Sequence, residues 1–220
     1  MKAVKLLGNK KLKIIEIPKP EPNRGEVVIK VMASGICRTD IELLYNNVKP
    51  TNIIPGHEVS GIVDEVNEVK SFKKGDRVMV NCHSTCGKCK HCQNGDLIFC
   101  PQLKTIGFDL NGGHVEYMVI PESILRMLPH DITFESSIII SDALGSAYQA
   151  VKKVKIRNKS KVGIIGTRNF NDNELKELFS LAREKPFIKN IITHRFRIND
   201  AGKAFKIADE RKGIKVNLTP

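Results

Sequence analysis

Short segments of alternating hydrophobic and polar residues dominate the first part of the chain. Four of them span residues 26–34, 57–66, 75–80 and 114–120, and glycine, proline or polar residues separate them. Alternation with a period of two is typical of half-buried β-strands. The pattern therefore predicts a mainly β fold, a barrel with a few helices.

The last part of the chain changes to a helical period. Residues 166–182 predict one amphipathic helix with four apolar positions at i, i+3, i+4 and i+7: Leu175, Leu178, Phe179 and Ala182. Asn171 and Glu174 are its candidate capping pair. A second helix has the same spacing: Ala201, Ala204, Phe205 and Ala208. We expect a short strand on each side of this second helix, and Gly213 as its end.

Composition places the chain among globular proteins, with 220 residues, of which 41% are hydrophobic and 27% charged. The net charge of +12 is spread among carboxylates, and the three tyrosines and nine phenylalanines are not interleaved with basic residues. Nucleic acid is therefore not expected as a partner.

No apolar run approaches the roughly 20 residues that cross a bilayer, and the N-terminus lacks the apolar core of a secretory signal. We expect no membrane partner and a cytoplasmic location.

All six cysteines lie between positions 37 and 100, and four of them are closely spaced: Cys86, Cys89, Cys92 and Cys100. Each Cys-x-x-Cys turn can direct two thiolates at one point. Four thiolates fill the tetrahedral shell of Zn²⁺ and leave no position for a substrate. The spacing predicts a structural zinc site that folds a lobe at about residues 82–103.

Three other kinds of site could use cysteines at similar spacing. Disulfides are disfavoured in a cytosolic chain. A [4Fe–4S] cluster is the main rival, although its last spacing is usually shorter. A nucleic-acid zinc ribbon normally has two pairs that lie farther apart. Cys82, His83 and His91 are surplus to a four-cysteine site, and we expect them to be packed or solvent-facing.

Cys37 and His57 are a second candidate pair of ligands. A glycine lies close before each of them and allows tight backbone turns. Alone, Cys37 would be a buried small residue and His57 a structural histidine. Together they favour metal binding.

The order of these motifs resembles the zinc-dependent medium-chain alcohol dehydrogenase family. The motifs are Gly-Ile-Cys-Arg-Thr-Asp at 35–40, Gly-His-Glu at 56–58, the stretch 72–80 and the four-cysteine segment. The resemblance covers residues 1–155 and implies the GroES-like fold of that family's catalytic domain.

The resemblance implies roles for individual residues. Cys37, His57 and Asp142 correspond to the catalytic zinc ligands, and Glu58 to a glutamate behind the metal that can move onto it. These ligands leave a fourth position for water or alcohol. Thr39 corresponds to the hydroxyl through which the alcohol proton leaves. The family often has a histidine three residues later, where this chain has Glu42.

Family members transfer hydride to NAD or NADP bound in a Rossmann domain, which this sequence lacks. The stretch 163–166 has two glycines without the third of the Gly-x-Gly-x-x-Gly turn, and too few residues follow for the fold. By resemblance, Arg38 and Lys215 correspond to cofactor-phosphate contacts and Ser146 to a residue near the nicotinamide. We expect NAD(P) binding to be weak or absent.

The C-terminal residues resemble the end of the same dehydrogenases. This implies a single GroES-like domain built from residues 1–160 and 164–220, joined at a seam at 161–166. The leading hypothesis is an alcohol dehydrogenase-like domain with two zinc ions whose hydride transfer is lost or greatly reduced. The alternatives are a zinc-water hydrolase with Glu58 as base, and a non-catalytic zinc module. The resemblance implies a small-molecule alcohol or aldehyde as substrate, and we expect a monomer or a dimer unlike the family's.

Overall fold

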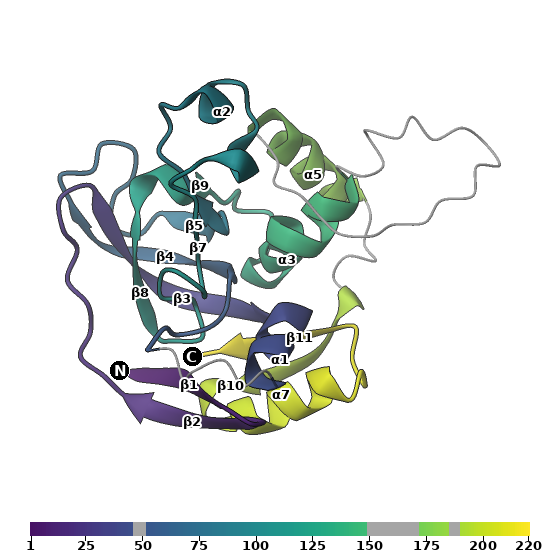
Figure 1. Cartoon of the computed structure of the whole chain (residues 1–220). Coiled ribbons are helices and arrows are strands. Elements are labelled where there is room, and N and C mark those ends of the chain that lie inside the picture. Colours follow the sequence, from purple (N-terminus) through teal and green to yellow (C-terminus); the bar gives the residue numbers. More distant parts are fainter. Residues whose placement is uncertain (46–51, 149–171, 185–189) are drawn as a thin grey trace.

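The computed structural model describes residues 1–45, 52–148, 172–184 and 190–220 (Figure 1). The predicted seam at 161–166 and the candidate cap residue Asn171 lie outside these residues.

Strands dominate the described residues, as predicted. They are β1 (Lys2–Gly8), β2 (Lys11–Glu16), β3 (Glu26–Ile36), β4 (Glu58–Asn67), β5 (Arg77–Val80), β6 (His83–Ser84), β7 (Lys104–Thr105), β8 (Tyr117–Pro121), β9 (Leu125–Met127), β10 (Ile192–Arg197) and β11 (Lys215–Thr219). The main sheet has the order β10-β11-β3-β4-β5-β9, with β8 also paired to β3. The pairs β1-β2 and β6-β7 form two small sheets. The four strands predicted from alternation are β3, β4, β5 and β8.

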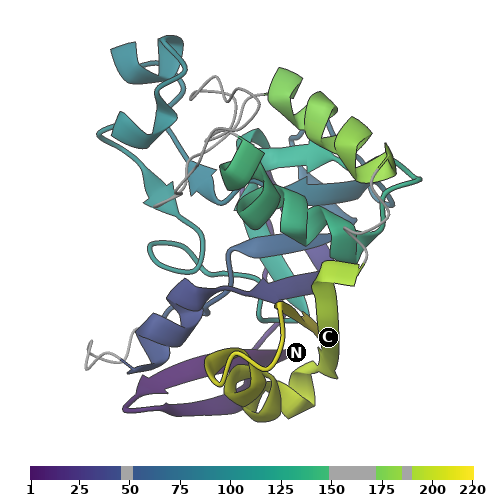
Figure 2. The same cartoon turned by 90° about the vertical axis from the view of Figure 1, so that its right-hand side faces the viewer.

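The helices are short and lie around the sheet (Figures 1 and 2). They are α1 (Arg38–Tyr45), α2 (Lys90–Gln93), α3 (Phe134–Ile139), α5 (Asp172–Glu184) and α7 (Ala201–Asp209). A π-helical turn, Ile140–Leu144, continues α3. Among the described helices, none has the length and apolarity needed to span a membrane.

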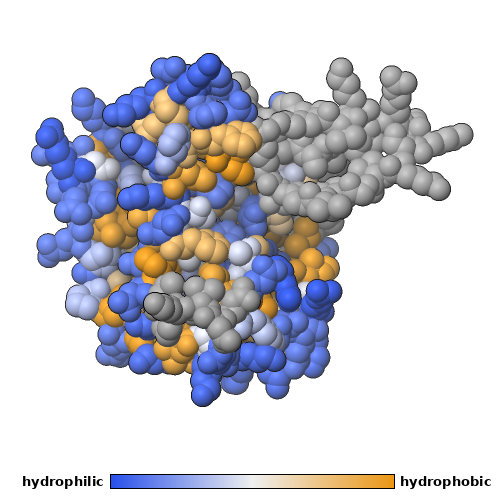
Figure 3. Space-filling view, in the orientation of Figure 1, coloured by the Kyte–Doolittle hydropathy of each residue, from blue (hydrophilic) through white to orange (hydrophobic). Residues whose placement is uncertain are grey.

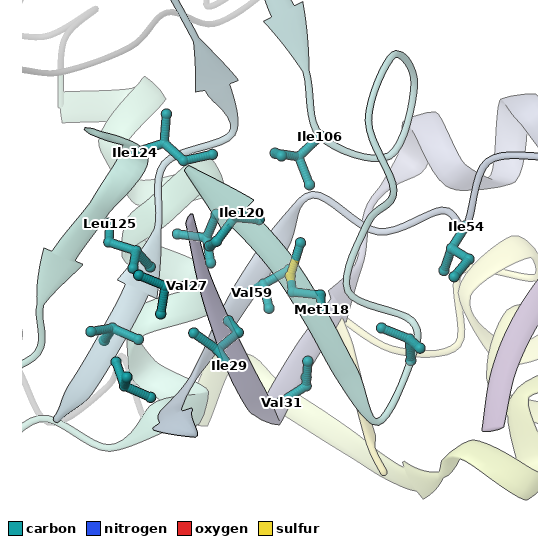
Figure 4. Packing of buried hydrophobic residues seen from close by; sticks show 14 of the residues in the cluster. Val27, Ile29, Val31, Ile54, Val59, Ile106, Met118, Ile120, Ile124 and Leu125 are labelled. Atoms are coloured by element: carbon teal, nitrogen blue, oxygen red, sulfur yellow. The ribbon is translucent and has the colours of Figure 1, made fainter. Parts of the chain in front are cut away.

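Strand β3 is the centre of the sheet. Strand β4 pairs antiparallel along one edge of β3. The other edge is shared, because β8 pairs with its first half and β11 with its second half. In β3, Val27, Ile29 and Val31 are buried in the core between the strands, and Figure 4 shows them beside residues of β8.

Two further apolar clusters attach the helices. In the first, Leu178 and Phe179 of α5 are buried with residues of α3. In the second, Val4 of β1 packs in one cluster with Ile41 of α1 and Phe205 of α7. The N-terminal strands therefore lie beside the C-terminal helix α7, as both views show (Figures 1 and 2).

The predicted tail elements are present, with one correction, and the first predicted helix is described only from its residue 172 onward, as α5. Helix α7 buries Ala201, Ala204 and Phe205. It ends at Asp209 and not at Gly213, and Arg211 supplies the left-handed backbone, with φ of 54°. Gly213 has another role, because a Cβ there would lie 2.7 Å from the Nδ1 atom of His194.

The surface carries both hydrophobic and hydrophilic residues. On the face drawn in Figure 3, hydrophobic residues gather over the middle and hydrophilic residues surround them. Ile214 is the most exposed of the large hydrophobic residues in the described part of the chain, at 75%.

Replacing Ile29 by alanine tests the central strand. Because Ile29 is fully buried, Ile29→Ala should lower the free energy of unfolding by about 2–5 kcal/mol. The matched control Ile214→Ala, at an exposed position, should change it by less than about 0.5 kcal/mol. Urea denaturation of both variants measures this, and equal effects would contradict the assigned core.

Candidate metal centres

Sheet register brings Cys37 and His57 together. Strand β3 ends directly before Cys37, and β4 begins directly after His57. In the antiparallel pair, Gly35 lies opposite Glu58. Two residues that are twenty positions apart therefore meet at one end of the sheet.

The start of α1 fixes the backbone of Cys37. The Asp40 carboxylate accepts a hydrogen bond of 2.9 Å from the Cys37 backbone N–H. This is the arrangement of a capping box, in which an acid in the first turn bonds back to the residue before the helix. The N-terminal end of a helix also favours negative charge, and Asp40 lies in this first turn.

Four donor atoms converge at this end of the sheet. One ligand atom from each of Cys37, His57, Glu58 and Asp142 lies within 4.8 Å of all the others. The Asp142 Oδ2 atom is 3.4 Å from the Cys37 Sγ atom and 3.8 Å from the His57 Nε2 atom. Thiolate, imidazole and carboxylate are ligands of Zn²⁺ in proteins. We refer to these four residues as the open group, because Cys37 and Asp142 remain half-exposed.

The π-helical turn supplies Asp142. It lies in the Ile140–Leu144 turn that extends α3. Such turns are rare and occur frequently at functional sites. The Ser141 hydroxyl donates to the Ile138 carbonyl at 2.9 Å and so helps to satisfy this turn.

Electrostatics in the open group favours a cation. Burial lowers the pKa of His57, but the Asp142 carboxylate and the Cys37 thiol outweigh this and raise it to about 12. Burial raises the pKa of Asp142, but His57 and its neighbours hold it well below its usual range. The anionic side chains that converge here thus stabilise a positively charged group between them.

Glu58 forms a buried ion pair with Lys215 of β11. Burial raises the pKa of Glu58 to about 7, while the Lys215 ammonium opposes that rise. Gly35 makes room for the carboxylate, because a Cβ there would lie 2.0 Å from the Glu58 Oε2 atom. The sequence interpretation assigned Lys215 to a cofactor phosphate and missed this partner, which only the pairing of β11 with β3 could have indicated.

Of the other predicted site residues, Thr39 lies beside the open group. The Thr39 hydroxyl lies 3.6 Å from the Cys37 Sγ atom. The Arg38 guanidinium lies 3.7 Å from Glu42 and 3.9 Å from Asp209, so it has carboxylate partners within the chain. Ser146 is buried.

The second group holds the four clustered cysteines, Cys86, Cys89, Cys92 and Cys100, whose Sγ atoms lie within 4.8 Å of one another. Three of the Sγ–Sγ distances are 3.5, 3.6 and 3.9 Å. Tetrahedral zinc with Zn–S bonds of about 2.3 Å requires about 3.8 Å. All six cysteines are free, so disulfides are absent from this lobe. Neither group contains Cys82, His83 or His91.

Backbone hydrogen bonds in the lobe favour a thiolate at Cys86. The backbone N–H groups of Lys88 and Cys89 lower the pKa of Cys86 to about 6. The lobe projects from the main sheet around α2 (Figure 1).

Comparisons with known proteins agree with this geometry. Residues 23–130 match the model of the alcohol dehydrogenase GroES-like domain. An alcohol dehydrogenase of Geobacillus stearothermophilus is 36% identical over 162 residues, which are 71% of this chain and 48% of that protein. An L-threonine 3-dehydrogenase of Pyrococcus horikoshii is 35% identical over 167 residues, 70% of this chain and 47% of that protein. An uncharacterised zinc-type alcohol dehydrogenase-like protein of Escherichia coli is 31% identical over 179 residues, 76% of this chain and 51% of that protein.

Solved structures show the same fold. The alcohol dehydrogenase from Thermus sp. ATN1 superposes with a TM-score of 0.82 at 16% identity, over 100% of this chain and 99% of that chain. The chain belongs to the zinc-dependent medium-chain alcohol dehydrogenase family and has the GroES-like fold of its catalytic domain. It spans about half the length of the curated relatives it matches.

Breaking the buried ion pair should destabilise the metal-free protein. In Lys215→Met, the Glu58 carboxylate stays buried without its cation, which should cost about 3–5 kcal/mol near pH 8. Burial raises the folded-state pKa of Glu58 above its unfolded value. The loss should therefore shrink as the pH falls through that folded pKa and the carboxyl binds a proton.

Denaturation of the chelated protein at about pH 8 and pH 5 measures this difference. The double variant Lys215→Met/Glu58→Gln should recover most of the lost stability, and the exposed control Lys206→Met should lose little. A single variant as stable as the wild type near pH 8 would contradict the buried pair.

Proposed function

We propose that this chain is the metal-binding catalytic part of an alcohol dehydrogenase and holds two zinc ions. Cys37, His57 and Asp142 would hold the catalytic ion, with Glu58 behind it. The four-cysteine lobe would hold the structural ion. The observation that carries the proposal is the convergence of thiol, imidazole and carboxylate donors from three separate elements within 4.8 Å.

The ligand atoms fit zinc at both groups. Without metal, the protonated His57 balances the negative charge of Asp142 in the open group. A zinc ion would displace that proton and take over the positive charge. When bound there, zinc would lower the pKa of an alcohol hydroxyl and favour its ionised form. Three protein ligands leave room for that hydroxyl, whereas the four thiolates of the lobe leave none.

The residues around the open group would orient the substrate and move its proton. We assign Thr39 to the exit of the alcohol proton, because its hydroxyl lies beside the Cys37 thiol at the half-exposed side of the group. Glu58 would keep negative charge next to the ligands, with Lys215 compensating it. The relatives are named for alcohol and L-threonine, so we propose a small-molecule alcohol or aldehyde as the substrate class.

The described residues do not fit NAD(P) as a resident cofactor. Their strands pair antiparallel except for β10 and β11, so this part of the chain has no doubly wound parallel sheet. Lys215 is buried against Glu58, and Arg38 has two carboxylate neighbours. We therefore propose that hydride transfer is lost or greatly reduced in this chain. We further propose that residues 1–160 and 164–220 form one domain, which the pairing of β11 with β3 supports.

We do not propose hydrolysis as the function. That alternative needs Glu58 as a general base with access to water. The Glu58 side chain is fully buried, and one of its oxygens accepts from the Lys215 ammonium. A base must lie within hydrogen-bonding reach of the proton that it removes.

Metal analysis tests the ligand assignment. We expect two zinc ions per wild-type chain and one in Asp142→Asn or Cys37→Ser, because each variant removes a donor from the open group only. Cys89→Ser should lose the other ion, and Cys82→Ser, outside both groups, should keep two. Elemental analysis after gel filtration gives the counts. One zinc or fewer in the wild type would refute the two-zinc assignment.

An activity assay tests the proposed loss of hydride transfer. Zinc-loaded protein with NAD or NADP and a panel of small alcohols should give no absorbance increase at the wavelength of the reduced cofactor. The physical reason is that two basic residues, Arg38 and Lys215, cannot replace the cofactor-binding crevice of a Rossmann domain. Robust turnover that is abolished in Asp142→Asn would overturn this part of the proposal.

A further inference from the structure

A buried acid–histidine pair lies behind the open group. Both Asp40 and His114 have side chains with 0% exposure, and the His114 Nε2 atom is 3.7 Å from the Asp40 Oδ2 atom. Neither residue was singled out from the sequence as a candidate. Neither belongs to a metal-ligand group within the described residues.

Asp40 joins the two backbone segments that carry Cys37 and His57. Its Oδ2 atom accepts the Cys37 N–H at 2.9 Å. Its Oδ1 atom accepts the Gly56 N–H, directly before His57, at 3.2 Å. One carboxylate therefore sets the separation of two ligand-bearing turns.

His114 is itself held on several sides. Its Nδ1 atom hydrogen-bonds with the Ser34 hydroxyl at 2.8 Å, and its ring meets the edge of Phe205 at 5.6 Å between centroids. The His114 backbone N–H donates to the Pro55 carbonyl at 3.0 Å. Gly56 leaves space for the ring, because a Cβ there would lie 2.6 Å from the Nδ1 atom.

Electrostatics explains why a histidine lies next to the buried Asp40 carboxylate. A fully buried carboxylate is costly unless its oxygens are hydrogen-bonded or a positive group lies nearby. Asp40 has two backbone N–H donors, and the His114 Nε2 atom lies 3.7 Å from its Oδ2 oxygen. Without the imidazole, Asp40 would lose part of this compensation, and the two turns that it joins would be held less firmly.

We propose that His114 is a positioning residue that acts through Asp40 to hold Cys37 and His57 in a chelating arrangement. The inference rests on the proposed metal binding at the open group. Partners of this kind behind the ligands typically contribute 10–100-fold to metal affinity.

The variants His114→Phe and His114→Gln test the proposal. Phenylalanine keeps a ring beside Phe205 but removes both nitrogens, whereas glutamine can still present an N–H toward Asp40. Competition with a zinc chelator, read through the visible spectrum of the cobalt-loaded protein, gives the affinity of each group separately. We expect His114→Phe to weaken the open group by about 10–100-fold with the four-cysteine group unchanged. His114→Gln should recover most of that loss.

A second measurement needs no metal. Hydrogen exchange of the Cys37 and Gly56 amides in the chelated protein should be faster in His114→Phe than in the exposed control His130→Phe. If His114→Phe does not fold, Ser34→Ala removes only the hydrogen bond at the Nδ1 atom. It should then give a smaller change of the same kind in both measurements.

Several results would overturn the inference. They are unchanged affinity in His114→Phe, an equal loss at both metal groups, no recovery with glutamine, or unchanged exchange of the two amides. A wild-type protein that binds no metal at the open group would instead refute the proposed function. The exchange measurement would still decide the role of His114.

Discussion

The antiparallel pairing of β3 with β4, closed on its other edge by β11, is the constraint on which the open group depends. Its register places Gly35 opposite Glu58, so Cys37 and His57 meet at the strand ends. The same end of β3 pairs with β11 and receives Lys215 from the far end of the chain. A shift of one residue in this register would turn each side chain of β4 to the other face. The ligands would then point away from one another.

Much of this arrangement is encoded locally and was predictable. Alternation located β3, β4, β5 and β8, although consecutive residues are buried along much of β3 and β4. The four-cysteine lobe was predictable because all its donors lie within fifteen residues, and short turns alone can bring them together. The approach of Cys37 to His57 was predictable only as a motif, since their meeting depends on strand pairing. The family resemblance, and not spacing, suggested Asp142.

The remaining features of the site depend on contacts between distant segments, which the identity of a single residue does not predict. Lys215 looked like a solvated or phosphate-binding charge, but pairing of β11 with β3 buries it against Glu58. His114 looked like one residue of a strand, yet tertiary packing places it 3.7 Å from Asp40. Gly213 looked like a helix end. Arg211 takes that backbone conformation, and Gly213 instead allows a close approach to His194.

The two metal groups therefore differ in how they depend on the fold. The four-cysteine group is closed by local chain, so its formation requires little of the sheet. The open group joins Cys37 to a carboxylate 105 positions away, and Glu58 to an ammonium 157 positions away. Its geometry exists only when the central sheet is complete, including the strand contributed by the C-terminal residues. For this reason metal affinity at the open group would report the integrity of the central sheet, while affinity at the lobe would report only the lobe.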